Sequence, residues 1–200
     1  LEHVTKSFGR YKALDDVSIV VEEGEFLTVI GRSGCGKTTL LNILAGFDAP
    51  DAGTVTLEGR SCGGPGPDRA VVFQEPALFP WLTVKKNVMF ALEMRGVKGK
   101  EAEEEALKYL AMVDLVKFAD HYPKELSGGM KQRVAIAGVI AMQPRCIVMD
   151  EPTAMLDPKG RREVMETIHT LNREKGITVV LITHYMDEAA QADRVVVMDG

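Results

Sequence analysis

The sequence predicts an α/β fold with a largely parallel sheet. Strand-like and helix-like segments alternate along most of the 200-residue chain, which is typical of that class. Two short apolar runs, residues 146–149 and 177–182, are expected to be buried strands. Between them Val164, Ile168 and Leu171 recur at spacings of four and three, which indicates an amphipathic helix. A chain of this length fits one domain, with room for a small inserted lobe.

The N-terminal part is expected to hold short strands around a strand–loop–helix unit. Residues 25–30 form an apolar run typical of a buried strand, and a glycine-rich loop follows it. Residues 38–45 continue as a helix that ends at Gly46. Residues 54–58 alternate polar and apolar side chains, as a half-buried strand does. After a loop rich in Gly and Pro, residues 69–73 are predicted to be a further strand.

The middle of the chain, from about residue 81 to residue 141, has a helical pattern instead. Its acidic stretch at residues 101–105 suits the N-terminus of a helix, where the backbone dipole favours negative charge. Four apolar side chains are expected to share one face of that helix: Ala106, Leu107, Leu110 and Ala111.

Composition excludes several classes of protein. The net charge of −5 argues against general nucleic-acid binding through phosphate contacts. No apolar run approaches the ~20 residues that cross a bilayer, so any membrane association is expected to come through a partner. Three cysteines without CxxC spacing fit a reducing compartment better than a zinc site or a disulfide framework. Because the chain opens without Met and stops without a tail, we interpret it as a domain-sized fragment that could lack its ends.

The loop after the strand at residues 25–30 has the pattern of a phosphate-binding loop. It matches G-x-x-x-x-G-K-[ST] immediately after a strand and before a helix. The glycines let backbone N–H groups point at phosphate oxygens, aided by the helix N-terminus. Lys37 can neutralise the β- and γ-phosphates, and the Thr38 hydroxyl can ligate Mg²⁺. The nucleotide-binding residues expected here are Gly31, Arg32, Ser33, Gly34, Cys35, Gly36, Lys37, Thr38 and Thr39.

Two other interpretations of this loop carry less weight. A chance glycine-rich turn is one, and the strand–loop–helix context argues against it. A thiol nucleophile at Cys35 is the other. No His or Asn lies near Cys35 in the sequence, so we interpret it as a small, tolerated loop residue.

Two adjacent carboxylates and a histidine follow the two C-terminal strands. Asp150 can hold Mg²⁺ directly or through water, and Glu151 can act as the base toward an attacking water. His184 is expected at the same carboxyl edge of the sheet, where α/β proteins bind ligands. It could donate a hydrogen bond to the γ-phosphate or hold the water. Either feature alone would suggest a solvated strand end or a structural histidine, but the phosphate loop upstream favours the catalytic interpretation.

The segment Leu126-Ser-Gly-Gly-Met-Lys-Gln-Arg133 resembles the LSGGQ signature motif of ABC ATPases, with Met at the last position. Five other elements of that family stand in its order along the chain: Walker A at residues 31–38, Gln74 as the Q-loop, Walker B at residues 146–151, a D-loop ending at Asp157, and His184 as the switch histidine. The resemblance covers essentially the whole chain.

The resemblance implies a particular domain organisation. The fold would be that of a P-loop NTPase (RecA-like core), with a mostly parallel sheet, a small antiparallel β region and an inserted helical lobe. Residues 1–80 and 144–200 would form the nucleotide-binding core, and residues 81–143 the lobe that carries the signature motif.

The resemblance also implies a shared active site. Two copies would pack head to tail, so that each ATP lies between Walker A of one subunit and the signature loop of the other. By the same match, Gln74 would sense Mg²⁺ and the lytic water, and Phe8 would stack on the adenine, although Tyr11 sits close to Phe8 and an aromatic there could be packed. The remaining nucleotide-binding residues implied are Ser127, Gly128, Gly129 and Asp157.

The two halves of the chain resemble different importers. Residues 71–84 look like the Q-loop region of nitrate, sulfonate and taurine importers, and residues 64–68 just before them strengthen that likeness. Residues 137–142, 151–158 and 182–188 are more similar to ATPases of energy-coupling-factor importers for cobalt, nickel and vitamins. Both likenesses indicate a prokaryotic importer. We give the front half more weight for substrate class, because it contains the region expected to meet the membrane subunit.

An importer ATPase of this kind implies ATP and Mg²⁺ as cofactors and a position on the cytoplasmic face of the cell membrane. Its expected partners are a second ATPase subunit in a homodimer, an integral membrane permease and, indirectly, an extracytoplasmic solute-binding protein. Phe79 and Trp81 could dock the permease, or could instead pack beneath the lobe. The rival functions are a soluble ABC ATPase acting in DNA repair or translation, and a P-loop kinase, which would not need the signature motif.

Overall fold

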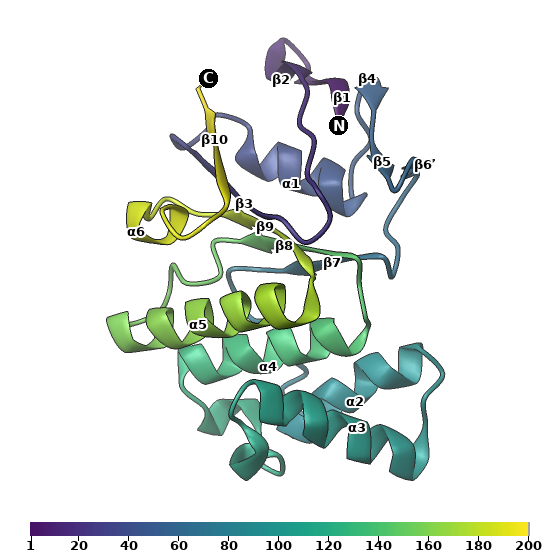
Figure 1. Cartoon of the computed structure of the whole chain (residues 1–200), viewed down its shortest axis with the longest axis vertical. Helices are drawn as coiled ribbons and strands as arrows, with labels where there is room; N and C mark the ends of the chain where they lie inside the picture. Colours follow the sequence, from purple (N-terminus) through teal and green to yellow (C-terminus); the bar gives the residue numbers. More distant parts are fainter. Residues whose placement is uncertain (200) are drawn as a thin grey trace.

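A five-stranded parallel sheet forms the centre of the molecule (Figure 1). The computed structural model describes residues 1–199. The strand order is β10-β3-β9-β8-β7, and all four pairings are parallel. The strands are β3 (Phe26–Gly31), β7 (Arg69–Val72), β8 (Cys146–Asp150), β9 (Thr178–Ile182) and β10 (Arg194–Met198). The predicted α/β class and largely parallel sheet are confirmed.

Helices cover both faces of this sheet. Helix α1 (Lys37–Ala45) lies on one face, and α4 (Gly128–Ala141) and α5 (Pro158–Lys175) lie on the other (Figure 1). Alternate residues of β8 therefore enter different cores: Ile147 packs with residues of α4 and α5, and Val148 packs with residues of α1. Burial on both faces explains why the strands read as continuous apolar runs.

A small antiparallel region packs beside α1. Its three-stranded sheet has the order β2-β1-β4, with β1 (Glu2–Phe8), β2 (Tyr11–Val17) and β4 (Ala52–Thr54). The single strand expected at residues 54–58 is wrong, because the chain changes partner within it. Strand β4 pairs with β1, whereas β5 (Thr56–Leu57) pairs with β6 (Arg60–Ser61). Between them the Val55 side chain is only 8% exposed and joins the core.

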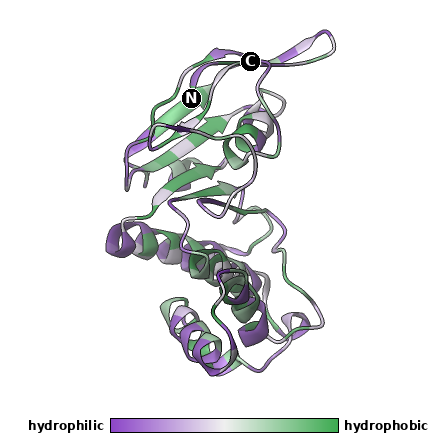
Figure 2. Cartoon of the chain, turned by 90° about the vertical axis from the view of Figure 1, so that its right-hand side faces the viewer, coloured by the Kyte–Doolittle hydropathy of each residue, from purple (hydrophilic) through white to green (hydrophobic). Residues whose placement is uncertain are grey.

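The helical segment expected in the middle of the chain forms a lobe with its own apolar core. It comprises α2 (Val84–Met94), α3 (Gly99–Met112), the short helices η1 (Val116–Phe118) and η2 (Pro123–Glu125), and one side of α4. In Figure 2 the strands of the sheet are mostly hydrophobic, whereas the lobe helices carry hydrophilic faces. No helix within residues 1–199 is both long and apolar enough to span a membrane.

The predicted apolar face of α3 is partly wrong. Ala106 and Leu110 are fully buried, but Leu107 is half-buried and Ala111 is exposed. The buried stripe instead continues to Ala102, four residues before Ala106. Leu107 still packs against the lobe core, at the edge of the buried stripe, whereas Ala111 lies on the solvent side of the helix.

Candidate functional site

The predicted phosphate loop lies between β3 and α1. Gly34 and Gly36 adopt φ angles of +84° and +97°, which side chains with a Cβ rarely tolerate. A Cβ on Gly36 would also collide with the carbonyl of Ala13. Gly36 caps α1 without a side-chain hydrogen bond, so the first N–H groups of the helix remain available to an anion.

Lys37 is folded across the loop. Its Nζ donates to the carbonyl oxygens of Gly31 and Arg32, both at 2.8 Å, and its side chain is only 9% exposed. The Cys35 thiol is buried beneath the loop, 3.8 Å from the same nitrogen. This packing supports the interpretation of Cys35 as a loop residue.

A pocket of about 560 Å³ opens over this loop. It brings together eleven of the side chains and glycines singled out in the sequence: Phe8, Gly31, Ser33, Gly34, Gly36, Lys37, Thr38, Thr39, Asp150, Glu151 and His184. Arg32 and Cys35 belong to the same loop but do not line the pocket. The carboxyl edges of β3, β8 and β9 meet here, as expected for parallel neighbours.

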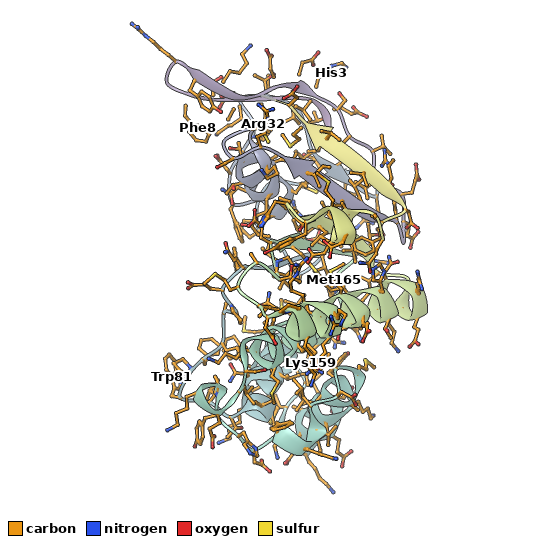
Figure 3. The ribbon with its side chains drawn as sticks, turned by 90° about the vertical axis from the view of Figure 1, so that its left-hand side faces the viewer. His3, Phe8, Arg32, Trp81, Lys159 and Met165 are labelled. Atoms are coloured by element: carbon orange, nitrogen blue, oxygen red, sulfur yellow. The ribbon has the colours of Figure 1, made fainter. Side chains whose placement is uncertain are left out.

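Two aromatic side chains stand at the pocket wall. Phe8 and Tyr11 are 53% and 57% exposed, and Figure 3 shows Phe8 at the same end of the molecule as Arg32. The Tyr11 hydroxyl donates to the carbonyl of Gly34 at 2.6 Å, so that ring is tied to the phosphate loop. The Lys6 ammonium lies 5.5 Å from the centroid of the Phe8 ring.

Both carboxylates face the pocket although they are neighbours in sequence. Asp150 ends β8, whereas Glu151 has already left the strand and adopts a φ of +45°, which is uncommon for a residue with a side chain. The Glu151 N–H still donates to the carbonyl of Ile182, at 2.9 Å. This turn brings a Glu151 carboxylate oxygen to 3.3 Å from Nδ1 of His184.

The electrostatics of the pair favour a cation. Burial raises the pKa of the Asp150 carboxyl, the charge of Glu151 raises it further, and the charge of Lys37 partly offsets both. A divalent cation beside Asp150 would relieve this repulsion. Within the described residues 1–199, no group of three or more His, Cys, Asp or Glu is placed to hold a metal. The protein atoms suited to Mg²⁺ are thus the Asp150 carboxylate and the Thr38 hydroxyl, with phosphate oxygens needed to complete the shell.

The signature residues lie outside this pocket. Ser127 caps α4, where its hydroxyl accepts from the N–H of Met130 at 3.3 Å. Ser127 and Gly128 are exposed, while Gly129 is buried so closely against α5 that a Cβ would meet the Cα of Gly160 at 3.1 Å. One subunit therefore presents the α4 N-terminus to solvent and not to its own phosphate loop.

Gln74 and Asp157 also lie outside the pocket. Gln74 is exposed in the loop after β7. Asp157 caps α5, and its carboxylate accepts from the N–H of Gly160 at 3.1 Å. Sequence reasoning missed Ala13 and Ile182, which complete the pocket lining, because neither residue carries a chemical signal of its own.

A phosphate loop, a carboxylate pair and a histidine at one sheet edge match a known family. The family model described as "ABC transporter" matches residues 14–154. The chain belongs to the ABC transporter family. It is 49% identical over 203 residues to an uncharacterized ABC transporter ATP-binding protein of Methanocaldococcus jannaschii, covering 99% of this chain and 76% of that protein.

Other members of the ABC transporter family are similar over the whole chain. The spermidine/putrescine import ATP-binding protein PotA of Nitrosospira multiformis is 45% identical over 203 residues, covering 100% of this chain and 56% of PotA. The chain thus spans about half the length of that relative. Neither relative is named for nitrate, sulfonate, taurine or energy-coupling-factor import, so those finer likenesses stay predictions.

A solved structure confirms the ABC ATPase fold. The dimeric, post-hydrolysis ATP-binding cassette MJ0796, bound to ADP and Pi, aligns with a TM-score of 0.86 and 36% identity. The alignment covers 99% of this chain and 93% of that one. The chain is therefore an ABC ATPase domain with a P-loop NTPase core.

Proposed function

We propose that the chain is the ATP-binding and hydrolysing subunit of a prokaryotic ABC importer, in which two subunits close around ATP and drive solute through a separate membrane protein. The observation that carries this proposal is the exposed α4 N-terminus. Ser127 and Gly128 are accessible and do not line the pocket of their own subunit, so they are free to meet the nucleotide of a partner. The dimeric form of MJ0796 supports the same arrangement.

Each residue of the pocket has a part in this proposal. Lys37 exchanges its two backbone carbonyl partners for phosphate oxygens when ATP enters, and Phe8 stacks on the adenine. Glu151 accepts a proton from the attacking water. His184, whose Nδ1 lies 3.3 Å from the Glu151 carboxylate, donates a hydrogen bond toward the γ-phosphate.

Thr38 and Asp150 would hold Mg²⁺ together with the phosphates, Gln74 would join them on closure, and the ion would neutralise charge on the transferred phosphoryl group. Closure of the dimer adds Ser127, Gly128 and Gly129 of one subunit to the γ-phosphate of the other. Gln74 and Asp157 approach the shared nucleotide at the same time. Hydrolysis then needs positioning and charge neutralisation, which one subunit supplies only in part.

We propose two lobes with different partners. Residues 1–80 and 144–200 hold the nucleotide, and residues 81–143 meet the permease. Phe79 is half-buried against Phe90, with ring centroids 4.7 Å apart. Its backbone N–H donates a hydrogen bond to the Asn87 side chain, and its carbonyl accepts one from the same side chain. Phe79 therefore serves packing, whereas Trp81 is 70% exposed at the lobe edge and is the better docking residue (Figure 3).

The substrate class proposed is nitrate, sulfonate or taurine, with a cobalt or vitamin importer of the energy-coupling-factor type as the alternative. PotA is named for spermidine/putrescine import, which is a different solute class, so this proposal rests on the likeness of residues 71–84 and not on overall identity. The proposed place is the cytoplasmic face of the cell membrane, with an extracytoplasmic solute-binding protein as an indirect partner.

Replacing Trp81 with Ala is expected to weaken recovery of the membrane subunit about 10-fold, because an exposed aromatic at an interface centre is a typical hot spot. A tagged protein is captured from detergent-solubilised membranes, and the polytopic partner is quantified. Met94→Ala is the matched control, since Met94 is 69% exposed at the other end of α2. The wild type should recover a polytopic membrane protein.

Recovery of no membrane protein by the wild type would contradict the importer proposal and favour a soluble ABC ATPase. ATP turnover of the Trp81 variant should stay unchanged. Phosphate release without any added acceptor excludes the rival P-loop kinase.

A further inference from the structure

The helix α6 (Met186–Ala189) carries a buried carboxylate that the proposed mechanism does not use. Glu188 is only 2% exposed. A buried charge is costly unless it is paired and hydrogen-bonded. We therefore consider which groups compensate the buried charge of Glu188 and where they lie relative to the pocket.

Four hydrogen bonds converge on this carboxylate from three segments. Oε1 accepts from the Thr153 hydroxyl at 2.6 Å and from Nε and Nη2 of Arg161 at 3.1 and 3.0 Å. Oε2 accepts from the Thr183 hydroxyl at 2.7 Å. Thr153 and Thr183 are both fully buried. The Glu188 carboxylate is thus held on both oxygens.

These partners flank the residues proposed to act on ATP. Thr153 is two positions after Glu151, and Thr183 immediately precedes His184. Arg161 stands four positions after the α5 cap at Asp157, whose carbonyl accepts the Arg161 N–H at 2.9 Å. One carboxylate therefore joins the segments that carry the base, the switch histidine and the D-loop aspartate.

Arg161 also connects the Glu188 carboxylate to His184, through the ring of Tyr185. Its guanidinium carbon lies 3.5 Å from the centroid of the Tyr185 ring, and that ring lies 4.2 Å from the His184 ring. Burial acts to lower the pKa of Arg161, but the hydrogen bond and charge of Glu188, together with the charges of Asp187 and Tyr185, outweigh it and the net shift is upward. Arg161 accordingly remains a charged partner for Glu188 and a platform for Tyr185.

We propose that Glu188 is a positioning residue for ATP hydrolysis, which ties Thr153, Thr183 and Arg161 together and so holds Glu151 and His184 at their 3.3 Å separation. The inference rests on the proposed function, because it needs Glu151 and His184 to be the groups that act on the water. It assigns Glu188 no contact with the nucleotide, since Glu188 does not line the pocket.

A purely structural role for Glu188 makes a different prediction. The phosphate loop, residues 31–38, donates no hydrogen bond to the cluster. Loosening the cluster should therefore reduce kcat and leave ATP affinity intact, whereas a loss of fold would reduce both together. The division between kcat and ATP affinity separates the two roles.

The test is Glu188→Gln in the full-length protein, with kcat, ATP affinity and thermal unfolding measured together. Glutamine keeps the shape but removes the charge that holds Arg161, and we expect kcat to fall about 10-fold because small misplacements of reacting groups are costly. ATP affinity should stay within about twofold. Asp187→Asn is the matched control: Asp187 also bonds Arg161, at 3.2 Å, but its side chain is 75% exposed and bonds neither threonine.

A wild-type kcat in the Glu188 variant overturns the proposal. So does a fall in turnover that equals the fall in the fraction of folded protein. If that variant does not fold, Thr153→Val decides, because it removes one 2.6 Å hydrogen bond and keeps the volume. A lower kcat at unchanged ATP affinity then supports the inference, and an unchanged kcat refutes it. Glu151→Gln, measured in parallel, separates failure of this inference from failure of the proposed function. If Glu151→Gln is inactive while Glu188→Gln is normal, only the inference about Glu188 fails. If Glu151→Gln is active, Glu151 is not the base and the proposed function fails as well.

Discussion

Replacing Glu151 with Gln is expected to slow ATP hydrolysis at least ~10²-fold, because a carboxamide cannot take a proton from the attacking water. The Glu151 side chain lies in the pocket, 3.3 Å from His184, and its left-handed backbone is what turns it there. Phosphate release and ATP affinity should be measured on the same preparation. Affinity should persist, because the phosphate loop is unchanged.

The same variant should accumulate as an ATP-bound dimer, which size-exclusion chromatography with light scattering would detect. Glu174→Gln is the control, since Glu174 is exposed on α5 and does not line the pocket. Near-normal turnover of the Glu151 variant would remove Glu151 from the role of base.

Replacing Ser127 with Arg is the second change expected to have a large effect. A long cationic side chain would stand at the exposed α4 N-terminus, where it blocks the approach of a second subunit. We expect turnover to fall ~10²-fold or more, since the γ-phosphate then lacks the stabilising groups that the second subunit supplies. ATP binding by single subunits should stay largely intact, because Ser127 does not line the pocket of its own chain.

Loss of a helix cap is the competing explanation, and it costs about 1 kcal/mol of stability. Thr83→Arg controls for it: Thr83 caps α2 in the lobe by accepting the N–H of Lys86 at 3.3 Å, the same kind of bond that Ser127 makes. The Thr83 variant should keep its turnover as an isolated protein. Unchanged activity of the Ser127 variant would refute the arrangement in trans.

The class of fold could be predicted because its main signals are local. The strands of the parallel sheet are buried on both faces and read as apolar runs, and the glycine-rich loop between β3 and α1 follows one of them directly. The choice of pairing partner for a strand, in contrast, is not visible in its own sequence. Strand 54–58 alternates correctly, yet it divides at Val55, because β4 pairs with the distant strand β1 whereas β5 pairs with the adjacent strand β6.

The candidate site likewise contains residues that the sequence could identify and residues that only the fold brings together. Residues within a motif, such as Lys37 and Asp150, could be singled out by their spacing, and the pocket places them together. The Glu188 cluster could not, because Thr153 and Glu188 are 35 positions apart and Glu188 reads as an ordinary residue of a short helix. The residues of this chain indicate at most a class of importer and do not name the transported solute, since under the proposed function this subunit never touches it.

Mixing two inactive variants tests most directly whether each active site is shared between two molecules. Lys37→Ala disables the phosphate loop, and Ser127→Ala removes the signature hydroxyl without adding a side chain that would block closure of the mixed dimer. In a shared arrangement a mixed dimer contains one site with neither change, so an equal mixture should recover up to about a quarter of wild-type turnover. If each subunit instead hydrolysed ATP within its own chain, no unaltered site would exist, and the mixture would be no more active than either variant alone.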